Sequence, residues 1–433
     1  MSGYARAAHA LGATISGSDS AQTPYLERLS EEGVLDARIG HQAFNVPHGD
    51  DVELVYSSAV PAGNPERVAA RERGIADRPR ADLLAELTAL RRTIAVAGAH
   101  GKTTTASMIV HVLRATGIDP SWLVGSSVGA TLANSHWVAT EWLVVEADES
   151  DRSMLSLDVE IAVLTNVELD HHATFGSLDE LREAFREFLA RARGAVVVWD
   201  RPDLLALLEP AAAGIAGGPT VEVVRYDVPA PELQPGGSRF QWRGSDVRLS
   251  VPGAHNALNA AAALEVTSLV GVDGRTAIAG FAGAARRFQR LGATAHGAIV
   301  IDDYAHHPTE VTATLSAART LQPKRLVAVF QPHLYSRTEL LAEEFGAALA
   351  QADVIALLDV YPARERAEDH PGISGLTIVR STATHAGEPR VLWLQTFEQA
   401  ERELRKLLGE GDLCVVMGAG DVDALARRLV SVP

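Results

Sequence analysis

Seven consecutive residues constrain the fold of this chain more than any other stretch: Gly98-Ala99-His100-Gly101-Lys102-Thr103-Thr104. A short apolar run, residues 92–97, precedes them, and apolar residues recur at helical spacing from 103 to 115. The pattern predicts a strand, a tight loop and a helix. A glycine loop at the start of a helix points unpaired backbone N–H groups at an anion, a lysine there reaches phosphate oxygens, and a following threonine holds magnesium. We therefore predict a phosphate-binding site.

The loop departs from the usual P-loop pattern. That pattern places a glycine five residues before Gly101, where this chain has Val96, and the first glycine comes at Gly98. A plain strand-to-helix turn also accounts for the glycines, but it does not account for Gly-Lys-Thr-Thr at the start of a helix. We favour a shorter variant of the phosphate loop.

Composition sets the limits within which such a site works. The 433 residues, 47% of them hydrophobic, are enough for roughly three domains. The net charge of -16 argues against a nucleic-acid-binding protein, so the phosphorylated ligand is expected to be small. The one cysteine, Cys414, excludes an internal disulfide, indicates a reducing compartment and lies in an apolar run that predicts core packing. No apolar run is long enough for a membrane span and no signal peptide is recognisable, so we expect a cytoplasmic protein without membrane insertion.

Apolar strand patterns alternate with helical patterns along the chain, which is typical of parallel α/β layers. Three blocks are expected, beginning at the N-terminus, near Thr93 and near Gly292. The third alternates most regularly and predicts a doubly wound sheet. The expected strands are 13–16, 52–57, 92–97, 141–146, 161–165, 298–301, 325–330 and 354–359. The expected helices include 4–11, 25–32 and a long polar helix at 178–193, with loops at 214–219 and 229–237.

A cluster of four carboxylates, at residues 146–151, follows one of the most apolar strands. Such a run is often a solvated loop, but ligands of parallel sheets gather at the carboxyl ends of the strands. Magnesium on a nucleotide takes few protein ligands, typically one hydroxyl and one carboxylate. Thr103 and Glu146 would supply that pair.

Other polar clusters also follow strands. Asp170, His171 and His172 are candidates for a metal or substrate site rather than for packing. Asn256 and Asn259 lie at the start of an alanine-rich helix, where capping and adenine recognition both remain open. Residues 302–308 and 331–337 form the expected wall of one site in the third block, although Asp303 also suits a helix cap.

Read together, these motifs resemble the Mur ligases of peptidoglycan synthesis, in order and over essentially the whole chain. The matching segments are 16–19, 57–59, 98–104, 146–151, 165–171, 252–259, 286–288, 302–310, 330–338, 359–364 and 418–421. The His-His-Pro-Thr-Glu stretch at 306–310 and Phe-Gln-Pro-His at 330–333 favour the branch that adds L-alanine over the branch that recycles murein tripeptide.

The resemblance implies three domains. These are a UDP-sugar-binding Rossmann-like domain at 1–91, a central P-loop ATPase-like domain with a mixed sheet at 92–291, and a C-terminal Rossmann-like, doubly wound domain at 292–433. It implies an ADP-forming ligase that joins L-alanine to the lactyl carboxylate of UDP-N-acetylmuramate in peptidoglycan precursor synthesis. The implied partners are these two small molecules, the implied cofactors are ATP and magnesium, and the implied state is a monomer or weak homodimer.

The resemblance also assigns residues, motif by motif. The implied ATP-binding residues are Gly98, Ala99, His100, Gly101, Lys102, Thr103 and Thr104 in the loop, His255, Asn256 and Asn259 around adenine, and Asp303 near the ribose. The implied magnesium ligands are Thr103, Glu146 and His171. The implied substrate-binding residues are Asn166, Tyr304, His306, His333 and Arg337. The implied catalytic residues are Lys102, Arg287, His306 and His333.

In the implied reaction, the γ-phosphoryl group is first transferred to the carboxylate of the sugar, with Lys102 and Arg287 offsetting negative charge. The amine of alanine then attacks the acyl phosphate and expels phosphate. Attack needs a neutral amine, and either His306 or His333 is expected to accept its proton. Because an acyl phosphate hydrolyses in water, we expect the domains to close around it.

Three features depart from the family pattern. Residue 334 is leucine where many members have arginine, which leaves Arg337 to pair with the carboxylate of alanine, and residue 173 is alanine where aspartate is usual. The chain opens within what resembles the end of the glycine-rich loop for the UDP diphosphate, so we expect the first, central strand to be missing and the true start to lie upstream. Two alternatives stay open: a nucleotide-binding protein without ligase activity, because the UDP-sugar site is incomplete, and a related murein peptide ligase.

Overall fold

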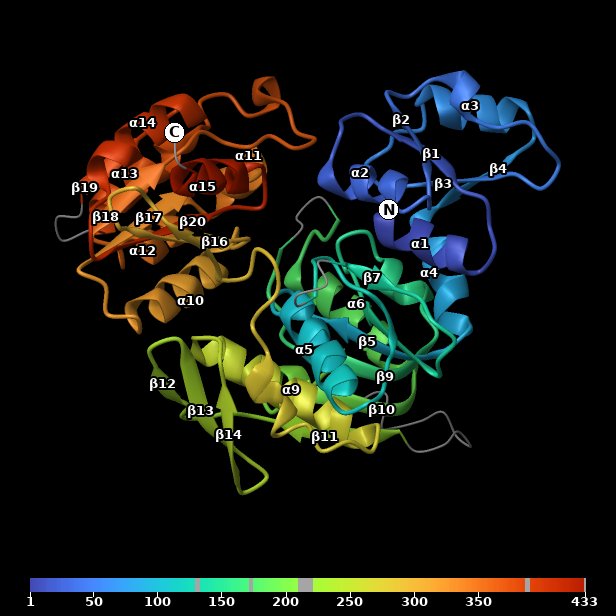
Figure 1. Cartoon of the computed structure of the whole chain (residues 1–433), viewed down its shortest axis with the longest axis horizontal. Helices are drawn as coiled ribbons and strands as arrows, with labels where there is room; N and C mark the ends of the chain where they lie inside the picture. Colours follow the sequence, from blue (N-terminus) through green and yellow to red (C-terminus); the bar gives the residue numbers. More distant parts are fainter. Residues whose placement is uncertain (129–132, 171–173, 209–220, 386–389, 432–433) are drawn as a thin grey trace. The chain divides into compact units, whose positions relative to one another are not determined.

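The computed structural model covers the whole chain and describes residues 1–128, 133–170, 174–208, 221–385 and 390–431 (Figure 1). The chain forms two compact units. Unit 1 comprises Met1–Asp227 and Ala261–Ala277, and unit 2 comprises Val228–Ala260 and Ile278–Pro433. The long helix α9 (Ala254–Leu269) contributes residues to both units.

The N-terminal part of unit 1 contains two separate two-stranded parallel sheets. β1 (Ser16–Asp19) pairs with β2 (Asp36–Ile39), and β3 (Glu53–Tyr56) pairs with β4 (Ala76–Pro79). No residue of these four strands is fully buried. The helices of this part are α1 (Ser2–Ala10), α2 (Pro24–Glu31), α3 (Pro65–Glu72), α4 (Arg80–Ala89) and the 3-10 turn η1 (Ala43–Asn45). Strands and helices alternate as in a Rossmann-like domain, but the strands do not join into one sheet.

The strand predicted at 13–16 is displaced, because β1 begins only at Ser16. Residues 11–13 instead close helix α1. The N–H groups of Leu11 and Ala13 donate to the carbonyl oxygens of Ala7 and Ala8 over 3.1 and 3.0 Å. Hydrogen bonds to the last carbonyls of the helix therefore use the residues that the apolar pattern assigned to the strand.

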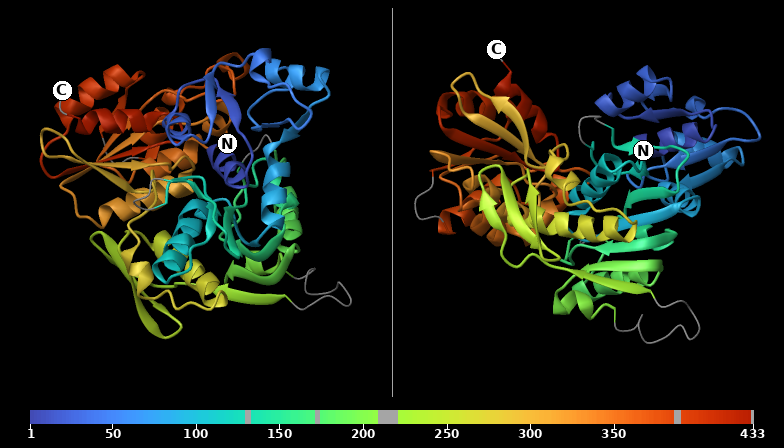
Figure 2. Two further views of the ribbon diagram at one scale, coloured as in Figure 1. Left: turned by 45° about the vertical axis from the view of Figure 1, so that its right-hand side comes forward. Right: turned by 60° about the horizontal axis from the view of Figure 1, so that its bottom comes forward.

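A seven-stranded mixed sheet forms the centre of unit 1, in the order β11-β10-β9-β5-β8-β6-β7. Figure 2 shows strands of this sheet side by side, coloured from teal to green. All neighbouring strands are parallel except β6 and β7. The strands are β5 (Arg92–Ala97), β6 (Ser121–Leu123), β7 (Ser135–His136), β8 (Trp142–Glu146), β9 (Val159–Leu164), β10 (Ala192–Trp199) and β11 (Glu222–Tyr226). The mixed sheet predicted for the central domain is confirmed. Because β5 lies between β8 and β9, the loops after these three parallel strands leave the sheet at the same edge.

Strand β5 is buried on both faces, as is typical of a central parallel strand. On one face, Leu87 of α4 and Phe185 and Phe188 of α6 (Leu178–Leu189) belong to one apolar core with alternate residues of β5, β8, β9 and β10. Helix α5 (Lys102–Ala115) packs against β5 and β8. The shorter elements of this region are the 3-10 turn η3 (Ser153–Ser156) and the helix α7 (Pro202–Leu205). The 3-10 turn η4 (Ala277–Gly280) begins at the last residue of unit 1 and continues into unit 2.

The long helix predicted at 178–193 ends earlier, at Leu189. Strand β10 begins at Ala192, and its residues 195–198 are buried between β9 and β11. The polar helix pattern continues across residues 190–193, so the sequence does not show where the helix ends. The β-branched residues 196–198 favour a strand, and their burial in the sheet stabilises that conformation.

A three-stranded antiparallel sheet belongs to unit 2: β12 (Glu232–Gln234), β13 (Gly237–Trp242) and β14 (Ser245–Leu249). The loop predicted at 229–237 is therefore wrong in part, since it contains β12 and the turn into β13. Glycine and proline here mark a hairpin turn between paired strands rather than a long loop. The loop predicted at 214–219 lies outside the described residues.

The main sheet of unit 2 has six strands in the order β15-β16-β20-β17-β18-β19, and only β15 runs antiparallel. The strands are β15 (Gln289–Ala293), β16 (Ile299–Asp303), β17 (Arg325–Phe330), β18 (Val354–Leu357), β19 (Arg390–Trp393) and β20 (Asp412–Met417). The helices are α10 (Pro308–Arg319), α11 (Tyr335–Leu340), α12 (Ala342–Leu349), α13 (Gly375–His385), α14 (Phe397–Leu407), α15 (Val422–Val430) and the 3-10 turn η5 (Ala367–Asp369). The expected boundary at 291/292 falls inside β15.

Alternate residues of these strands enter two different cores. One core joins the sheet to α10, α12 and α13, and the other joins it to α14 and α15. Helices therefore cover both faces, which confirms the predicted doubly wound sheet. Cys414 is fully buried in β20, and burial raises its thiol pKa to about 12. Within the described residues, no helix has both the length and the apolar character needed to cross a bilayer.

Candidate nucleotide and amino-acid site

The loop after β5 is held closely against the end of β9. The N–H of Ala99 donates to the carbonyl oxygen of Asn166 over 3.2 Å, and the hydroxyl of Thr165 donates to the carbonyl oxygen of His100 over 2.6 Å. At Gly98, φ is +132°, and a Cβ there would overlap Thr165 Oγ1 and lie 2.9 Å from the Asn166 carbonyl oxygen. Only glycine fits this position without a shift of the β9 end.

Asn166 uses both polar atoms of its side chain on the same loop. Its Oδ1 accepts from the N–H of His100 over 2.9 Å, and its Nδ2 donates to the His100 carbonyl oxygen over 3.0 Å. The His100 ring lies 2.9 Å from a carboxylate oxygen of Glu168. Asn166 therefore braces the phosphate loop in this structure, and its assignment to the substrate stays a prediction.

Lys102, the first residue of α5, is directed at the loop and at the acidic segment after β8. Its Nζ donates to the carbonyl oxygen of Gly98 over 2.6 Å and lies 2.9 Å from both carboxylate oxygens of Glu149. Glu149 is 1% exposed. Burial alone would lower the pKa of Lys102, but the charges of Glu149, Asp148 and Glu146 and the hydrogen bond to Glu149 together outweigh burial and raise the pKa, so the ammonium stays charged at neutral pH.

Thr103 and Glu146 lie together, as the sequence predicted for a magnesium site. The Thr103 hydroxyl donates to Glu146 Oε2 over 3.1 Å, and Glu146 Oε1 accepts from the N–H of Gly125 over 2.6 Å. A hydroxyl and a carboxylate are hard oxygen donors, which is the donor set magnesium prefers on a nucleotide. The third predicted ligand, His171, and the variant position Ala173 lie outside the described residues.

In unit 2, the turn that carries Arg287 is strained and fixed by Asp303. Arg286 and Phe288 have φ of 56° and 51°, in the left-handed region that most side chains avoid. Asp303 Oδ2 accepts from the N–H of Phe288 over 2.7 Å, and its Oδ1 accepts from the N–H of Ala305 over 2.7 Å. Asp303 therefore holds the backbone beside Arg287.

Asp303 does not cap helix α10. The N-cap is His307, whose Nδ1 lies 3.4 Å from the N–H of Thr309, and Pro308 occupies the first helical turn. The capping role that the sequence left open for Asp303 is thus taken by the imidazole four residues later.

The guanidinium of Arg287 lies 5.1 Å from the centre of the Tyr304 ring and 3.6 Å from a Glu310 carboxylate oxygen. The His306 ring is 5.3 Å from the Tyr304 ring and 6.1 Å from the His333 ring. The structure therefore brings Arg287, Tyr304, His306 and His333 together at the carboxyl ends of β16 and β17.

The two histidines present different ring nitrogens. Nδ1 of His306 lies 3.0 Å from the Tyr304 carbonyl oxygen and 3.1 Å from a Glu310 carboxylate oxygen, and both of these groups only accept, so Nδ1 carries the proton. Nδ1 of His333 lies 3.3 Å from Nη1 of Arg337, which only donates, so Nδ1 of His333 is unprotonated. In the neutral rings, the lone pair of His306 is therefore on Nε2, whereas that of His333 is engaged by Arg337.

Arg337 is only 3% exposed, and the His333 ring stacks on Tyr361 with ring centres 5.7 Å apart. The sequence did not single out Tyr361. Its backbone explains the contact, since the N–H of Tyr361 donates to the Pro332 carbonyl oxygen over 2.8 Å and its carbonyl oxygen accepts from the N–H of Leu334 over 3.0 Å. The variant residue Leu334 is thus the N-cap of α11, with φ 70°.

The predicted adenine residues lie at the start of α9, in the part that belongs to unit 2. Desolvation, helped by the charge of Arg287, lowers the pKa of His255 to about 4, so its ring is neutral. Asn256 is buried and its Nδ2 donates to the Pro252 carbonyl oxygen over 2.7 Å. Asn259 is also buried, one helical turn further along. The predicted site residues therefore divide between unit 1 and unit 2.

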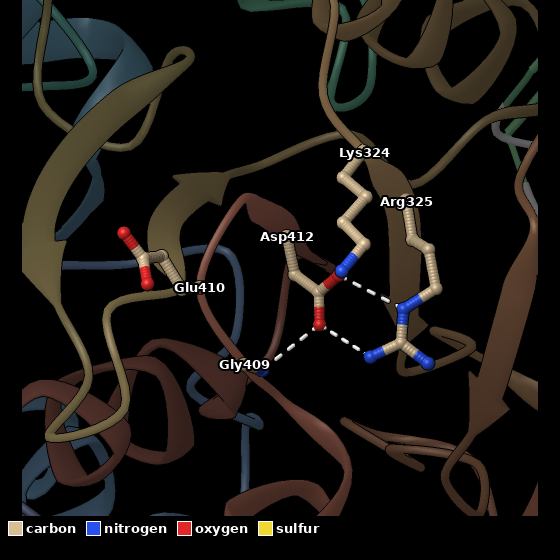
Figure 3. A pocket seen from close by; sticks show the side chains of 5 residues that line it. All are labelled: Lys324, Arg325, Gly409, Glu410 and Asp412. Carbon is tan, nitrogen blue, oxygen red and sulfur yellow. Dashed lines mark hydrogen bonds and ion pairs between the residues drawn. The ribbon is translucent and has the colours of Figure 1, made fainter.

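A surface pocket of unit 2 lies at the end of β17 opposite to the end that precedes His333 and Arg337. It is lined by Lys324, Arg325, Gly409, Glu410 and Asp412, at the amino ends of β17 and β20 (Figure 3). Arg325 Nε donates to Asp412 Oδ1 over 2.8 Å, so these two charges of the pocket neutralise each other. This ion pair ties the starts of two neighbouring strands.

Three family models match successive parts of the chain. They describe the Mur ligase family catalytic domain at 1–92, the Mur ligase middle domain at 96–267, and the Mur ligase glutamate ligase domain at 286–420. A protein of Mycobacterium sp. (strain JLS) named UDP-N-acetylmuramate–L-alanine ligase is 42% identical over 100% of this chain and 92% of its own length. The chain belongs to the Mur ligase family. A protein of Rubrobacter xylanophilus with the same name is 40% identical over 100% of this chain and 97% of its own length.

Solved structures of Mur ligases share the fold. The UDP-N-acetylmuramate–alanine ligase of Thermotoga maritima superposes with a TM-score of 0.81 at 25% identity, covering 99% of this chain and 95% of that one. A murein peptide ligase from Psychrobacter arcticus gives a TM-score of 0.70 at 24% identity over 99% and 95%. This Mur ligase is therefore an enzyme of the three-domain architecture predicted from its motifs.

Proposed function

We propose that this Mur ligase joins L-alanine to the lactyl carboxylate of UDP-N-acetylmuramate, with ATP converted to ADP and phosphate. The observation that carries the proposal is the pairing of Lys102 with Glu149 and of Thr103 with Glu146 at the start of α5, because phosphate chemistry accounts for both pairs. The full-length relatives named UDP-N-acetylmuramate–L-alanine ligase support the choice of sugar and amino acid. Because both substrates and ATP are cytoplasmic metabolites, we also place the reaction in the cytoplasm.

A carboxylate is a poor acyl donor, so the reaction needs an acyl phosphate. The γ-phosphoryl group passes to a carboxylate oxygen of the sugar, ADP leaves, and the charge on the phosphoryl oxygens is offset by Lys102. Arg287 is the matching cation of unit 2, and its strained turn, fixed by Asp303, limits the directions that the guanidinium can take. Lys102 belongs to unit 1 and Arg287 to unit 2, so the proposal assigns one phosphate-binding cation to each unit.

Thr103 and Glu146 are the residues that would hold magnesium. When bound, the ion neutralises phosphate charge and orients the oxygens of the nucleotide. The 3.1 Å contact between the hydroxyl and the carboxylate shows that the two side chains converge, with Glu146 further fixed by the N–H of Gly125. Their convergence supports a divalent-cation site of oxygen ligands.

The amine of alanine is protonated in water and attacks only after it loses a proton. We assign His306 as the group that accepts this proton. Its Nδ1 faces two acceptors and therefore carries a hydrogen, so its Nε2 carries the lone pair. His333 is less suited, since its unprotonated Nδ1 already accepts from Arg337. Attack of the neutral amine on the acyl carbon forms the amide bond, and the C–O bond to phosphate breaks.

The proposal is tested by omitting substrates one at a time. ADP and phosphate are expected only when UDP-N-acetylmuramate, ATP and L-alanine are all present, and Lys102→Gln is expected to remove the signal. Binding of ATP without any binding of UDP-N-acetylmuramate would instead support a nucleotide-binding protein without ligase activity. Turnover with an L-alanyl-γ-D-glutamyl peptide and none with L-alanine would instead support a murein peptide ligase.

A further inference from the structure

Arg80 carries an ion-pair network that none of the roles above uses. It is the first residue of α4, and its side chain is 23% exposed. Nη2 of Arg80 donates to Asp148 Oδ2 over 2.9 Å and to Asp151 Oδ2 over 2.7 Å, and Nε donates to Asp151 Oδ2 over 3.0 Å. An arginine within residues 1–92, the segment that matches the first family domain, is thus tied to the acidic loop after β8.

The same loop contacts the phosphate loop. Glu146 accepts from Thr103, and Glu149 pairs with Lys102. Two carboxylates of residues 146–151 therefore contact Thr103 and Lys102 of the phosphate site. The other two, those of Asp148 and Asp151, contact Arg80. A single short segment therefore connects Arg80 to Lys102 and Thr103.

The charges of this segment explain why a cation is needed there. Arg80 lies at ion-pair distance from the carboxylates of Asp148 and Asp151, while the other two carboxylates of the segment contact Thr103 and Lys102. Without the guanidinium of Arg80, the carboxylates of Asp148 and Asp151 would oppose the binding of a polyanion such as a nucleoside triphosphate.

We propose that Arg80 is a positioning residue for nucleotide binding, which neutralises Asp148 and Asp151 and holds the acidic loop in the place that leaves Lys102 for phosphate. The inference rests on the proposed function, since ATP is the ligand. Arg80 acts through the loop and through its charge, and it links the segment of the first family domain to the phosphate site.

The chain offers a matched control for Arg80. Arg92 also pairs with two carboxylates, those of Glu141 and Glu160, over 2.9 Å each. It lies at the first residue of β5, at the opposite end of that strand from the phosphate loop. Arg92→Gln removes the same kind of ion pairs without changing the charge near Lys102.

The test measures ATP binding by isothermal titration for the full chain and for Arg80→Gln, Arg80→Lys and Arg92→Gln. Arg80→Gln is expected to raise the Kd for ATP about tenfold, because a half-buried charge network is left uncompensated. Arg80→Lys is expected to recover most of the affinity, and Arg92→Gln to leave it unchanged. The loss in Arg80→Gln is expected to shrink at high salt, which a purely structural defect would not show.

A second substitution separates charge from folding. Asp151→Asn keeps Oδ1, which accepts from the N–H of Ser153 over 3.1 Å, and removes one negative charge. The double variant Arg80→Gln/Asp151→Asn is expected to regain most of the affinity, and Asp151→Asn alone to bind ATP more tightly than the unchanged chain. If Arg80→Gln fails to fold, Asp151→Asn alone still tests the inference. ATP binding by Asp151→Asn that is equal to or weaker than that of the unchanged chain would overturn it.

Equal losses in Arg80→Gln and Arg92→Gln, or a double variant as weak as Arg80→Gln, would also overturn it. A full chain that binds no ATP would refute the proposed function itself. ATP binding that is the same with and without Arg80 would refute only the role of Arg80.

Discussion

Gly98 offers the most direct structural test of the phosphate loop. In Gly98→Ala, the new Cβ would overlap Thr165 Oγ1 and lie 2.9 and 3.0 Å from the carbonyl oxygen and nitrogen of Asn166. Relieving the overlap displaces either the loop or the end of β9, at a cost of about 1–3 kcal/mol. The φ of +132° adds about 1–2 kcal/mol of backbone strain for alanine. We therefore expect a total loss of about 2–5 kcal/mol in the free energy of unfolding.

Gly117 is the matched control, since it follows the other end of α5. Its φ is +93°, and an added Cβ would meet no atom within 4 Å. Gly117→Ala is thus expected to cost only the backbone strain of about 1–2 kcal/mol. Both variants are compared by thermal unfolding and by ATP titration, and only Gly98→Ala is expected to lose ATP binding. Equal Tm shifts in the two variants, with normal ATP binding in Gly98→Ala, would refute the close packing of the loop on β9.

Three further outcomes follow from buried groups. Burial raises the pKa of Asp302 to about 6. The stability that the protonated carboxyl contributes is therefore fully present below about pH 4, and about 3 kcal/mol of it is lost as the pH rises to about 6. Asp302→Asn should raise Tm at pH 7.5 more than at pH 4.5, and equal shifts at the two pH values would contradict this. Lys102→Met removes the cation that pairs with the buried Glu149 carboxylate and should lower the free energy of unfolding by about 3–5 kcal/mol, whereas Lys102→Met/Glu149→Met should recover stability in denaturant titrations but not ATP turnover. A double variant no more stable than the single one would argue against the pair. The thiol of Cys414 should react with iodoacetamide only after unfolding, since it is fully buried with a pKa of about 12, and modification of the native chain would contradict its place in β20.

Periodicity and turn residues predicted the elements around the phosphate loop well. The expected strand at 92–97 is β5, and the helix predicted from Thr103 begins one residue earlier as α5. Strand β10 was missed, because the polar pattern of α6 runs into it without a break and only burial between β9 and β11 shows where the helix ends. Local pattern thus identifies an element more reliably than its end.

The sequence also showed which chemical groups gather near the phosphate loop more easily than it showed which of them contact each other. The four carboxylates of residues 146–151 were found as one cluster, but their division between Thr103, Lys102 and Arg80 depends on how the loop turns after β8. Glu149 and Arg80 were therefore not singled out. Asp303 was expected near the ribose or at a helix cap, and its hydrogen bonds to backbone N–H groups beside Arg287 follow from a strained turn that spacing does not reveal.

The central claim is that the carboxylate of the sugar is activated as an acyl phosphate before alanine attacks. It is tested by supplying UDP-N-acetylmuramate whose lactyl carboxylate carries oxygen-18, together with ATP, magnesium and L-alanine, and by analysing the products by mass spectrometry. Transfer of the γ-phosphoryl group to one labelled oxygen, followed by cleavage of that C–O bond, predicts one labelled oxygen in the released phosphate and the other in the amide carbonyl. Formation of the amide with unlabelled phosphate, or release of phosphate without any L-alanyl product, would contradict the account.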